Sequence, residues 1–514
     1  MRIGVDVGGT NTDAVLMDGE TVVASTKKPT TPNVGDGIVD AISTVIDSAR
    51  IAVDKIAIVS IGTTHFTNAF VQRRGLDAVG AIRIGLPAAK ALPPYAGWPA
   101  AIREAVGGQS VMVRGGHQCD GRETAPLDEI AIARAATRFR KSGLTSIAIS
   151  AVFAPVNRSM EERAAEIVRN EAPDAAVTLS SMIGRVGLLE RENAGIMNAS
   201  LASLARATIG GFREALEKLG VNAPFYISQN DGTLMSAAFV EQYPVLTFAS
   251  GPTNSMRGAA YLLALDDALV ADIGGTTTDV GALHKGFPRE SSTVVDIGGV
   301  RTNFRMPDVF AIGLGGGSLV TADDGRVKIG PQSVGYRITE DALVFGGTTT
   351  TATDIAVAAG YADIGDAERV KHLDDAFVAR AVDEIHRLIE DGVDRMKTDA
   401  ADRPLVLVGG GAILVDRPLK GVSAVYTDES AGVANAIGAS IAQVGGEVDK
   451  VYSYEAVGRD KAIEQAVAEA SANAAAAGAA AQTVKVTDLE ELPLAYMPGG
   501  AVRLRVKVAG DLAA

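Results

Sequence analysis

The chain has 514 residues, which is enough for two or three domains with large buried cores. Its net charge of −14 argues against a nucleic acid or an anionic membrane as partner, because either would need a basic face. One cysteine, Cys119, excludes an intrachain disulfide framework, a four-cysteine zinc site and an iron–sulfur cluster held by this chain alone. No apolar run is long enough to span a bilayer, and the first residues have the pattern of a strand and not of a signal peptide, so we expect a cytoplasmic protein.

The first element is a predicted β-hairpin with a glycine tip. Apolar runs at residues 3–7 and 14–17 flank the sequence VDVGGTNTD at residues 5–13. Glycines let main-chain N–H groups approach an anion, and consecutive N–H groups in a tight turn bind phosphate. An aspartate at each end suits a hydrated Mg²⁺, which usually takes one or two carboxylates and keeps its waters. A single hairpin of this kind is more often only a turn.

Strand and helix patterns then alternate through the first half of the chain. Residues 56–62 are predicted to form a buried strand that ends in Gly-Thr-Thr-His65, and residues 147–153 a second one. His65 follows a strand end, where active-site residues collect, so a proton-transfer or ligand role and a structural role are both open. Helices are predicted at residues 35–48, 67–73 and 159–170, and residues 180–219 are predicted to be mainly helical.

The glycine hairpin recurs at residues 271–279 (ADIGGTTTD), between apolar runs at 268–273 and 280–283. Two copies, each opening one half of the chain, indicate two loops that bind one polyphosphate. We expect Asp6 and Asp272 to hold Mg²⁺, directly or through water, and Asp13 and Asp279 to orient the hairpins; turn capping is the alternative role for each aspartate. The predicted nucleotide contacts are Gly8, Gly9, Thr10, Asn11, Thr12, Asp13, Gly274, Gly275, Thr276, Thr277, Thr278 and Asp279.

The second half continues with a long predicted helix at residues 376–396 and a strand at 404–408 that leads into Gly409, Gly410 and Gly411. This glycine turn either packs flat against an adenosine or is only a tight strand-to-helix turn, and its position after the second hairpin favours the nucleotide. A helix of small residues follows at 430–444. No GxxxxGK[ST] sequence occurs, which excludes a P-loop.

The last part of the chain has the pattern of a small βαββ unit. Strands are predicted at residues 448–454, 484–486 and 502–508, and an alanine-rich helix runs up to residue 481. The tail contains no histidine and no cysteine, so no nucleophile–base pair of the Ser–His or Cys–His kind is present there. We expect it to dock a partner or a second copy through an edge strand such as 502–508.

The order of these motifs is that of the actin, Hsp70 and sugar-kinase superfamily, in which two RNase H-like lobes close over ATP. Within it, the chain resembles the hydantoinase A/oxoprolinase family over residues 1–445. The segments that carry this resemblance are IGTTHFTN (61–68), GRVGLLER (184–191) with Asn198-Ala199 behind it, SQNDG (228–232), ASGP (249–252), GGGS (315–318), GPQS (330–333), TD (353–354) and VGGG (408–411).

The resemblance implies an α/β fold with two RNase H-like, actin-like ATPase lobes around an ATP cleft and a small α/β C-terminal appendage. We expect an N-terminal lobe (1–180), a helical connecting segment (181–265), a C-terminal lobe (266–445) and the appendage (446–514). The resemblance also implies that the chain is the ATP-using subunit of an enzyme. Such an enzyme phosphorylates the carbonyl oxygen of a small cyclic amide, such as a hydantoin or lactam, and this step leads to ring opening. ATP and Mg²⁺ are the implied cofactors, and a hydantoinase B-type subunit or another adjacent-gene product is the implied partner in a hetero-oligomer.

The expected substrate contacts lie between the two hairpins in sequence. Glu190, Arg191 and Asn198 fall on one predicted helix, with Glu190 and Asn198 on roughly one face, and Asn230 and Asp231 are expected opposite them. An ordinary helical ion-pair surface is the alternative. Two departures from the family pattern lie in expected substrate or partner regions. GPQSVGY (330–336) is followed by RITE where larger members continue with Pro-Gly-Pro, and His65 replaces an apolar residue.

Some motifs also fit other kinds of site or protein. His117, Cys119 and Asp120 have the residue types of a metal half-site, but no second Cys/His pair lies nearby, so a metal role is the less favoured alternative. A sugar kinase lacks support because no sugar-recognition signature is present; a dehydratase activator needs more cysteines; and an Hsp70-like chaperone needs a peptide-binding β-domain. The ATP-using subunit of a ketone carboxylase and a non-catalytic ATPase that reactivates another enzyme both remain open.

Overall fold

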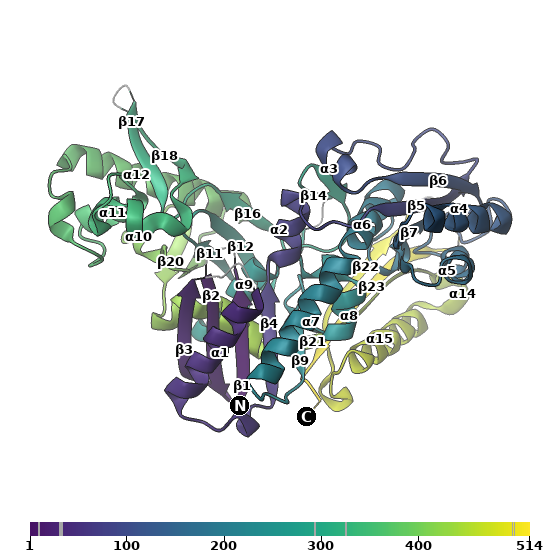
Figure 1. Ribbon diagram of the computed structural model, residues 1–514, viewed down its shortest axis with the longest axis horizontal. Coiled ribbons are helices and arrows are strands. Elements are labelled where there is room, and N and C mark those ends of the chain that lie inside the picture. The colour runs from purple at the N-terminus through teal and green to yellow at the C-terminus, as the bar shows by residue number, and fades with distance from the viewer. Residues whose placement is uncertain are drawn as a thin grey trace.

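The computed structural model describes residues 1–8, 11–29, 34–291, 294–323, 326–495, 497 and 499–513 (Figure 1). Strands and helices alternate along most of this length and form three main sheets. In Figure 1, the part of the chain that contains α11, α12, β17 and β18 projects away from the rest. We call this part, together with the sheet strands β11 and β12 that lead into it, the second lobe. None of the described helices combines the length and the apolar composition that a membrane crossing requires.

The largest sheet has nine strands and contains the first predicted hairpin. Its strand β1 pairs antiparallel with β2 and parallel with β4. The strand order is β22-β23-β21-β10-β9-β4-β1-β2-β3. The bounds are β1 (Arg2–Val7), β2 (Asn11–Asp18), β3 (Thr21–Pro29), β4 (Ile58–Thr63), β9 (Phe225–Ser228), β10 (Thr233–Ser236), β21 (Gln443–Ser453), β22 (Lys485–Pro493) and β23 (Ala501–Gly510).

Helices cover both faces of this sheet around β1, which explains why every residue of the strand except Arg2 is buried. Ile3 and Val5 belong to a core shared with α1 (Val34–Ala49), while an added Cβ at Gly4 would meet α13 (Ala434–Ile441). Because side chains alternate along a strand, Asp6 lies on the same face as Gly4 and faces α13. The alternation of side chains along β1 therefore points Asp6, the first predicted metal ligand, toward α13.

A second sheet of four parallel strands has the order β6-β5-β7-β8 and is covered by α4, α5 and α6. Arg83 of this sheet and Glu192 of α6 form a buried ion pair, and Ser150 Oγ donates to Glu192 at 2.7 Å. This pair fixes the helix that carries the predicted substrate residues. The bounds are β5 (Val79–Leu86), β6 (Gln109–Arg114), β7 (Ser146–Ala151), β8 (Ala176–Leu179), α4 (Glu129–Lys141), α5 (Ser159–Glu171), α6 (Leu188–Ser200) and α7 (Ala202–Lys218).

The third sheet carries the second predicted hairpin. Its order is β13-β12-β11-β19-β20, with β16 also paired to β12. The long helix α12 (Asp375–Met396) packs its apolar face on this sheet, and both the predicted helix 376–396 and the predicted strand 404–408 are confirmed. The bounds are β11 (Ala268–Ile273), β12 (Thr278–His284), β13 (Phe287–Pro288), β16 (Val309–Ile312), β19 (Arg403–Val408) and β20 (Val422–Tyr426).

The remaining elements are short helices and hairpins around these sheets. They are α2 (His65–Gln72), α3 (Ala100–Ala105), α8 (Ala237–Gln242), α9 (Ser250–Leu263), α10 (Ile338–Asp341), α11 (Ala352–Ala358), α14 (Tyr454–Val457), α15 (Arg459–Ala476), β14 (Val295–Ile297), β15 (Val300–Thr302), β17 (Ser318–Asp323) and β18 (Arg326–Ser333).

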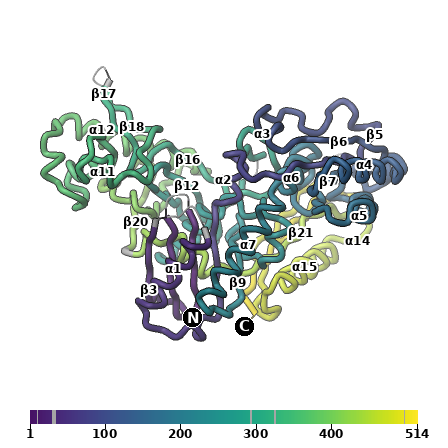
Figure 2. Tube along the Cα trace, in the orientation of Figure 1, coloured from purple at the N-terminus to yellow at the C-terminus, as the bar shows by residue number. Residues whose placement is uncertain are grey.

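The C-terminal strands extend the first sheet. The predicted order of strand, helix, strand and strand is confirmed, but β21 pairs in parallel with β10, so the unit shares the nine-stranded sheet (Figure 2). The expectation that residues 502–508 form an edge strand is wrong. β23 lies between β21 and β22, and β22 is the edge. Strand order depends on non-local pairing, which the local pattern does not encode.

Two glycines bring α9 and α13 into very close contact. A Cβ added at Gly258 would lie 2.0 Å from the carbonyl oxygen of Ala434, and one added at Gly438 would lie 1.9 Å from that of Asn254. No larger residue fits at either position without moving one helix. The two helices run between the first sheet and the third, so this contact fixes how the two hairpins sit relative to each other.

Gly438→Ala is expected to lower the free energy of unfolding by roughly 1–3 kcal/mol or more, because the new methyl group overpacks the helix contact. Gly210→Ala is the matched control. Gly210 lies within α7 with no atom within 4 Å of an added Cβ, so alanine should stabilise that helix by about 0.5–1 kcal/mol. Urea unfolding measures both. Equal effects of the two substitutions would contradict the packing argument.

Candidate nucleotide site

The two glycine hairpins have the same register. Asp6 pairs with Asp13 across the first hairpin, and Asp272 pairs with Asp279 across the second. Each hairpin is closed in the same way, by an N–H of the first glycine donating to a carbonyl three residues later at 2.9 Å. Gly9 and Thr10, two of the predicted nucleotide contacts, lie outside the described residues. The sequence repeat is therefore a structural repeat, with one copy on each of two sheets.

A chain of polar side chains joins the two hairpins through α9 and α13. Asn435 Nδ2 donates to Asp6 Oδ2 at 3.4 Å, and Ser255 Oγ makes short contacts with both Asn435 Oδ1 and Asp272 Oδ2. A serine hydroxyl has one proton, so it donates to only one of these two oxygens at a time. The two predicted metal ligands are thus linked through two side chains.

Burial and mutual repulsion disfavour the charged form of these carboxyls. Burial, together with the charge of Asp13, raises the pKa of Asp6 to about 6. Burial and the charge of Asp272 raise the pKa of Asp279 to about 7. Burial also raises the pKa values of Asp13 and Asp272, although Lys27 Nζ lies 2.8 Å from Asp13 and partly opposes the shift. The site has more negative charge than the described chain neutralises.

These residues fit a hydrated Mg²⁺. The Oδ1 atoms of Asp6 and Asp13 are buried without a hydrogen-bond partner, as are both amide atoms of Asn254. Among the described residues, no group of three or more His, Cys, Asp or Glu side chains has the arrangement of a metal site. Mg²⁺ commonly uses only one or two carboxylates and keeps several waters, so Asp6 and Asp272 would hold it together with phosphate oxygens.

A glycine-rich turn before β17 supports the tip of the second hairpin. The N–H groups of Gly316 and Gly317 donate to the carbonyls of Gly274 and Gly275 at 3.0 and 2.7 Å. A Cβ added at Gly315 would lie 2.5 Å from the Thr276 nitrogen. The tip itself (Gly275, Thr276 and Thr277) is exposed. The family motif at residues 315–318 did not by itself predict this supporting role, although its run of three glycines was the available signal.

The third predicted glycine turn lies against the base of the same hairpin. Gly411 N–H donates to the carbonyl of Ile273 at 2.7 Å, and a Cβ added at Gly409 would lie 2.5 Å from Asp272 Oδ1. Gly409 has φ +83°, which glycine adopts readily. An added Cβ at Gly410 would meet no atom within 4 Å. The fold therefore places this turn beside Asp272 with one open backbone face.

His65 begins α2 where strand β4 ends. Its backbone N–H donates to Thr63 Oγ1 at 3.1 Å, and Ser250 Oγ at the start of α9 donates to the Thr63 carbonyl at 3.2 Å. The imidazole is half-buried, and this burial lowers its pKa, which favours the neutral ring. His65 and the start of α9, the helix that carries Asn254 and Ser255, therefore both hydrogen-bond to Thr63.

The predicted substrate residues of α6 differ in what they contact. Glu190 is half-buried, with Oε1 3.6 Å from Nη2 of Arg301. Arg191 is buried, and its guanidinium donates to Ser180 Oγ and to backbone carbonyls that include Ala151. The Asn198 amide donates to Thr178 Oγ1 and to the Gln242 carbonyl. Arg191 and Asn198 therefore hold the interior of the chain together, and Glu190 is the more open of the three.

Asn230 and Asp231 lie in the turn between β9 and β10. Asn230 Nδ2 donates to the carbonyl of Arg305 at 2.5 Å, and its Oδ1 is buried without a partner. Burial alone would raise the pKa of Asp231, but the charges of Lys507 and Arg305 and hydrogen bonds from Thr233 outweigh burial and lower it. The segment 301–305 lies between the two predicted groups, since Arg301 faces Glu190 and Arg305 faces Asp231.

The predicted metal half-site around Cys119 has different contacts. His117 is buried with no hydrogen-bond partner at either ring nitrogen, and burial lowers its pKa. Asp120 forms an ion pair with Arg122 at 2.6 Å, and Cys119 is half-buried. In the part of the chain that the structure covers, this group does not contain three side chains arranged for a metal.

Asp279→Asn is expected to remove part of the pH dependence of stability. Because the pKa of Asp279 is raised from 3.8 to about 7, the folded protein holds this proton more tightly than the unfolded chain. The stability gained at acid pH is therefore lost as pH rises from about 4 to about 7. With about 1.4 kcal/mol per pKa unit, the variant should gain about 2–3 kcal/mol over wild type between about pH 5 and pH 8.

Urea unfolding with a metal chelator at the two pH values measures this difference. Asp363→Asn, which changes an exposed aspartate far from the hairpins in sequence, is the control and should follow wild type. Parallel pH profiles of Asp279→Asn and wild type would show that the Asp279 carboxyl is not held protonated.

The chain is similar to known proteins over most of its length. A family model described as hydantoinase/oxoprolinase N-terminal region matches residues 2–172, and one described as hydantoinase/oxoprolinase matches residues 191–366. Caprolactamase subunit alpha from Pseudomonas jessenii is 30% identical over 70% of this chain and 54% of its own length. Acetophenone carboxylase gamma subunit from Aromatoleum aromaticum is 28% identical over 70% of this chain and 53% of its own. The chain thus spans about half the length of these curated relatives.

Solved structures show the same fold. The crystal structure of ATP-dependent caprolactamase from Pseudomonas jessenii aligns with a TM-score of 0.80 at 21% identity, over 100% of this chain and 88% of that one. A nucleotide-free acetone carboxylase aligns with a TM-score of 0.68 at 20% identity, over the same shares. This likeness confirms the predicted fold class. With both halves of the family model matched in order, the chain belongs to the hydantoinase/oxoprolinase family.

Proposed function

We propose that the chain is an ATP-using subunit that activates a carbonyl oxygen of a small cyclic amide for ring opening. The observation that carries the proposal is the pair of hairpins in identical register on two sheets, joined through Ser255 and Asn435. All four carboxyls of the two hairpins have raised pKa values, and a bound Mg²⁺ would relieve this excess of negative charge.

The chemistry explains why a cyclic amide needs ATP. Resonance makes the amide carbonyl a poor electrophile and the amide nitrogen a poor leaving group. Transfer of the γ-phosphoryl group to the carbonyl oxygen releases ADP and makes the attached carbon a better electrophile. Addition of water to that carbon and departure of the amine break the C–N bond and leave an acyl phosphate, which a second water hydrolyses to the carboxylate and phosphate. Phosphoryl transfer mainly requires positioning and neutralisation of charge, which the hairpin N–H groups and a metal between Asp6 and Asp272 would supply.

The two named relatives support a carbonyl oxygen as the acceptor. One is a caprolactamase subunit and the other a carboxylase subunit for a ketone, acetophenone. A lactam and a ketone share only the carbonyl group, so the conserved step is expected to occur at its oxygen. The relative with 30% identity favours ring opening here, and the ATP-using subunit of a ketone carboxylase is the second candidate. We assign Glu190 and His65 to the binding of the substrate that accepts the phosphoryl group. Both side chains are half-buried, and neither belongs to a buried hydrogen-bond network among the described residues.

Mg·ATP is expected to raise the melting temperature of the wild-type protein by mass action. At a ligand concentration a hundred times Kd, the stabilisation is about 2.7 kcal/mol. Asp272→Asn should keep the fold, because the side chains have the same shape, but should lose most of the shift and lower ATP turnover by at least about a hundredfold. Thermal melting with and without Mg·ATP and a phosphate-release assay measure both effects.

Glu190→Gln provides the contrast for this prediction. It should leave the Mg·ATP shift intact and reduce only the substrate-stimulated part of ATP turnover, since Glu190 lies outside the hairpins. If Asp272→Asn binds and hydrolyses Mg·ATP like wild type, the assignment of the hairpins to the nucleotide is wrong.

The isolated chain is expected to show weak or no ring opening, because both relatives bear subunit names and the chain spans about half of their length. The experiment is ATP hydrolysis with lactams, hydantoins and ketones, measured for the chain alone and after co-expression with the neighbouring gene product. Turnover that depends on a cyclic amide supports ring opening, and turnover that depends on a ketone and bicarbonate supports the carboxylase. Turnover that responds only to a partner protein supports a reactivating ATPase and contradicts the proposal.

A further inference from the structure

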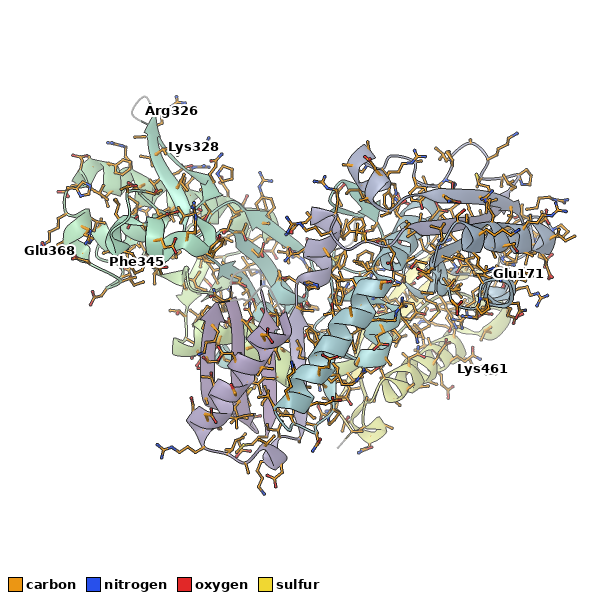
Figure 3. All side chains as sticks on the ribbon, viewed as in Figure 1. Glu171, Arg326, Lys328, Phe345, Glu368 and Lys461 are labelled. Carbon is orange, nitrogen blue, oxygen red and sulfur yellow. The ribbon has the colours of Figure 1, made fainter. Side chains whose placement is uncertain are left out.

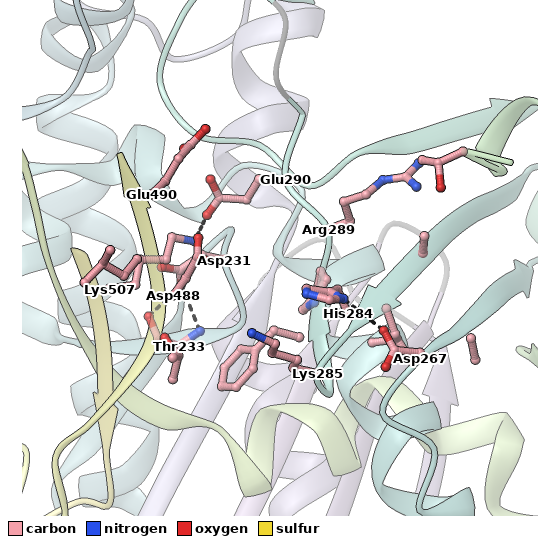
Figure 4. Close-up of a pocket in the computed structure, with 18 of the residues that line it drawn as sticks. Asp231, Thr233, Asp267, His284, Lys285, Arg289, Glu290, Asp488, Glu490 and Lys507 are labelled. Carbon is pink, nitrogen blue, oxygen red and sulfur yellow. Dashed lines mark hydrogen bonds and ion pairs between the residues drawn. The ribbon is translucent and has the colours of Figure 1, made fainter. Parts of the chain in front are cut away.

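A cavity of about 800 Å³ lies between the second lobe and the C-terminal strands, at the end of β11 and β12 opposite their glycine tip (Figure 4). One wall consists of β22 and β23, and the other is formed by the ends of β11 and β12 and the turn that follows β12. Its size is in the range of pockets that hold small metabolites. None of the roles assigned to the nucleotide site uses it, apart from Asp231 at its inner edge.

The wall formed by the C-terminal strands presents carboxylates. Asp488 and Glu490 of β22 stand opposite Lys507 and Arg505 of β23 in the strand register, so all four side chains share the face toward the cavity. Both cations already have carboxylate partners inside the chain, since each contacts Glu290 and Arg505 also lies near Glu447. Glu490 is 58% exposed, and no ion pair or hydrogen bond of the Asp488 side chain is found in the described residues. Asp488 is therefore a free anionic group on this wall.

The opposite wall presents a free cation. Lys285 sits in the two-residue turn between β12 and β13, where His284 pairs with Phe287. Its φ of +52° is a conformation that asparagine or glycine usually supplies in such a turn. Figure 4 shows the Lys285 side chain extending into the cavity toward the wall that carries Asp488. The described chain offers Lys285 no ion-pair or hydrogen-bond partner, whereas the neighbouring His284 contacts Asp267 at 2.9 Å.

Apolar side chains lie between the two charged walls. Leu283 and Phe287 line the second-lobe side of the cavity. Phe287 is held in place by the guanidinium of Arg257, which stacks 4.0 Å from the ring centroid. The cavity thus has a carboxylate at one side, an ammonium at the other and aliphatic or aromatic surface between them.

We infer that this cavity binds a small zwitterion: an amino acid whose ammonium and carboxylate groups are separated by an aliphatic chain. The ammonium would pair with Asp488, the carboxylate with Lys285, and the methylene groups would pack on the apolar residues. A ligand of one charge would leave one wall unpaired, which is why a zwitterion fits best. The inference stands on the cavity alone, although opening of a lactam ring would also release a molecule of this class.

Isothermal titration calorimetry of the full chain without nucleotide tests the proposal. The ligands are linear amino acids with a terminal amine, from glycine to the eight-carbon homologue, with n-hexylamine and hexanoate as single-charge controls. We expect binding to peak at one chain length and to be at least about tenfold weaker for the single-charge compounds. Lys285→Gln and Asp488→Asn should each weaken the best ligand by about tenfold or more.

Matched controls separate the site from general charge effects. Lys328→Gln changes an exposed lysine of β18 on the far side of the second lobe (Figure 3), and Asp363→Asn changes an exposed aspartate; both should bind like wild type. Asp272→Asn should also retain binding, which distinguishes this site from the nucleotide site. The proposal is overturned if no linear amino acid binds at millimolar concentration, if the single-charge compounds bind equally well, or if both cavity variants bind like wild type.

Discussion

The contact between α9 and α13 is the constraint on which the candidate site depends. The first hairpin belongs to the nine-stranded sheet and the second to the six-stranded sheet, so neither sheet alone can place Asp6 near Asp272. Helix α9 carries Ser255, α13 carries Asn435, and both side chains lie in the line between the two aspartates. Gly258 and Gly438 let the helix backbones approach until these polar side chains meet. The lack of a side chain at these two glycines thus determines how closely the polar and charged groups of the site approach one another.

The burial of these carboxyls between the two sheets lowers the free energy of unfolding. Burying several carboxyls with few cations raises their pKa values, so at neutral pH the folded chain either keeps protons that the unfolded chain releases or holds buried charges that repel one another. Such a cluster is expected where a cationic ligand is to be bound, because the ligand then removes repulsion as well as forming new bonds. The buried ion pair of Arg83 and Glu192 is different, since its two charges and Ser150 satisfy each other inside the chain.

The hairpins were predictable because everything that defines them is local. Apolar runs, a Gly-Gly tip and a repeated aspartate spacing fix both strands and their register, and the repeat itself indicated a shared ligand. Features that depend on distant pairing were not predictable. The strand of residues 502–508 has the alternating pattern of an edge strand with one charged face, yet its charged face is covered by Glu290 from another part of the chain. Likewise, the sequence did not reveal that the Arg191 guanidinium would donate its hydrogen bonds to backbone carbonyls inside the chain.

The covalent path from the nucleotide site to the C-terminal strands is short. Helix α13, which carries Asn435, ends at Ile441, and strand β21 begins at Gln443. No flexible linker separates the helix that contacts Asp6 from the strand that supports β23 and, through it, β22. The cavity wall that carries Asp488 is therefore built on the same rigid run of chain as the hairpin contact. The opposite wall, with Lys285, follows directly from β12, the second strand of the other hairpin. A change in the separation of the two hairpins would accordingly change the width of this cavity, and by reciprocity a ligand that fixes its width would alter the affinity for nucleotide.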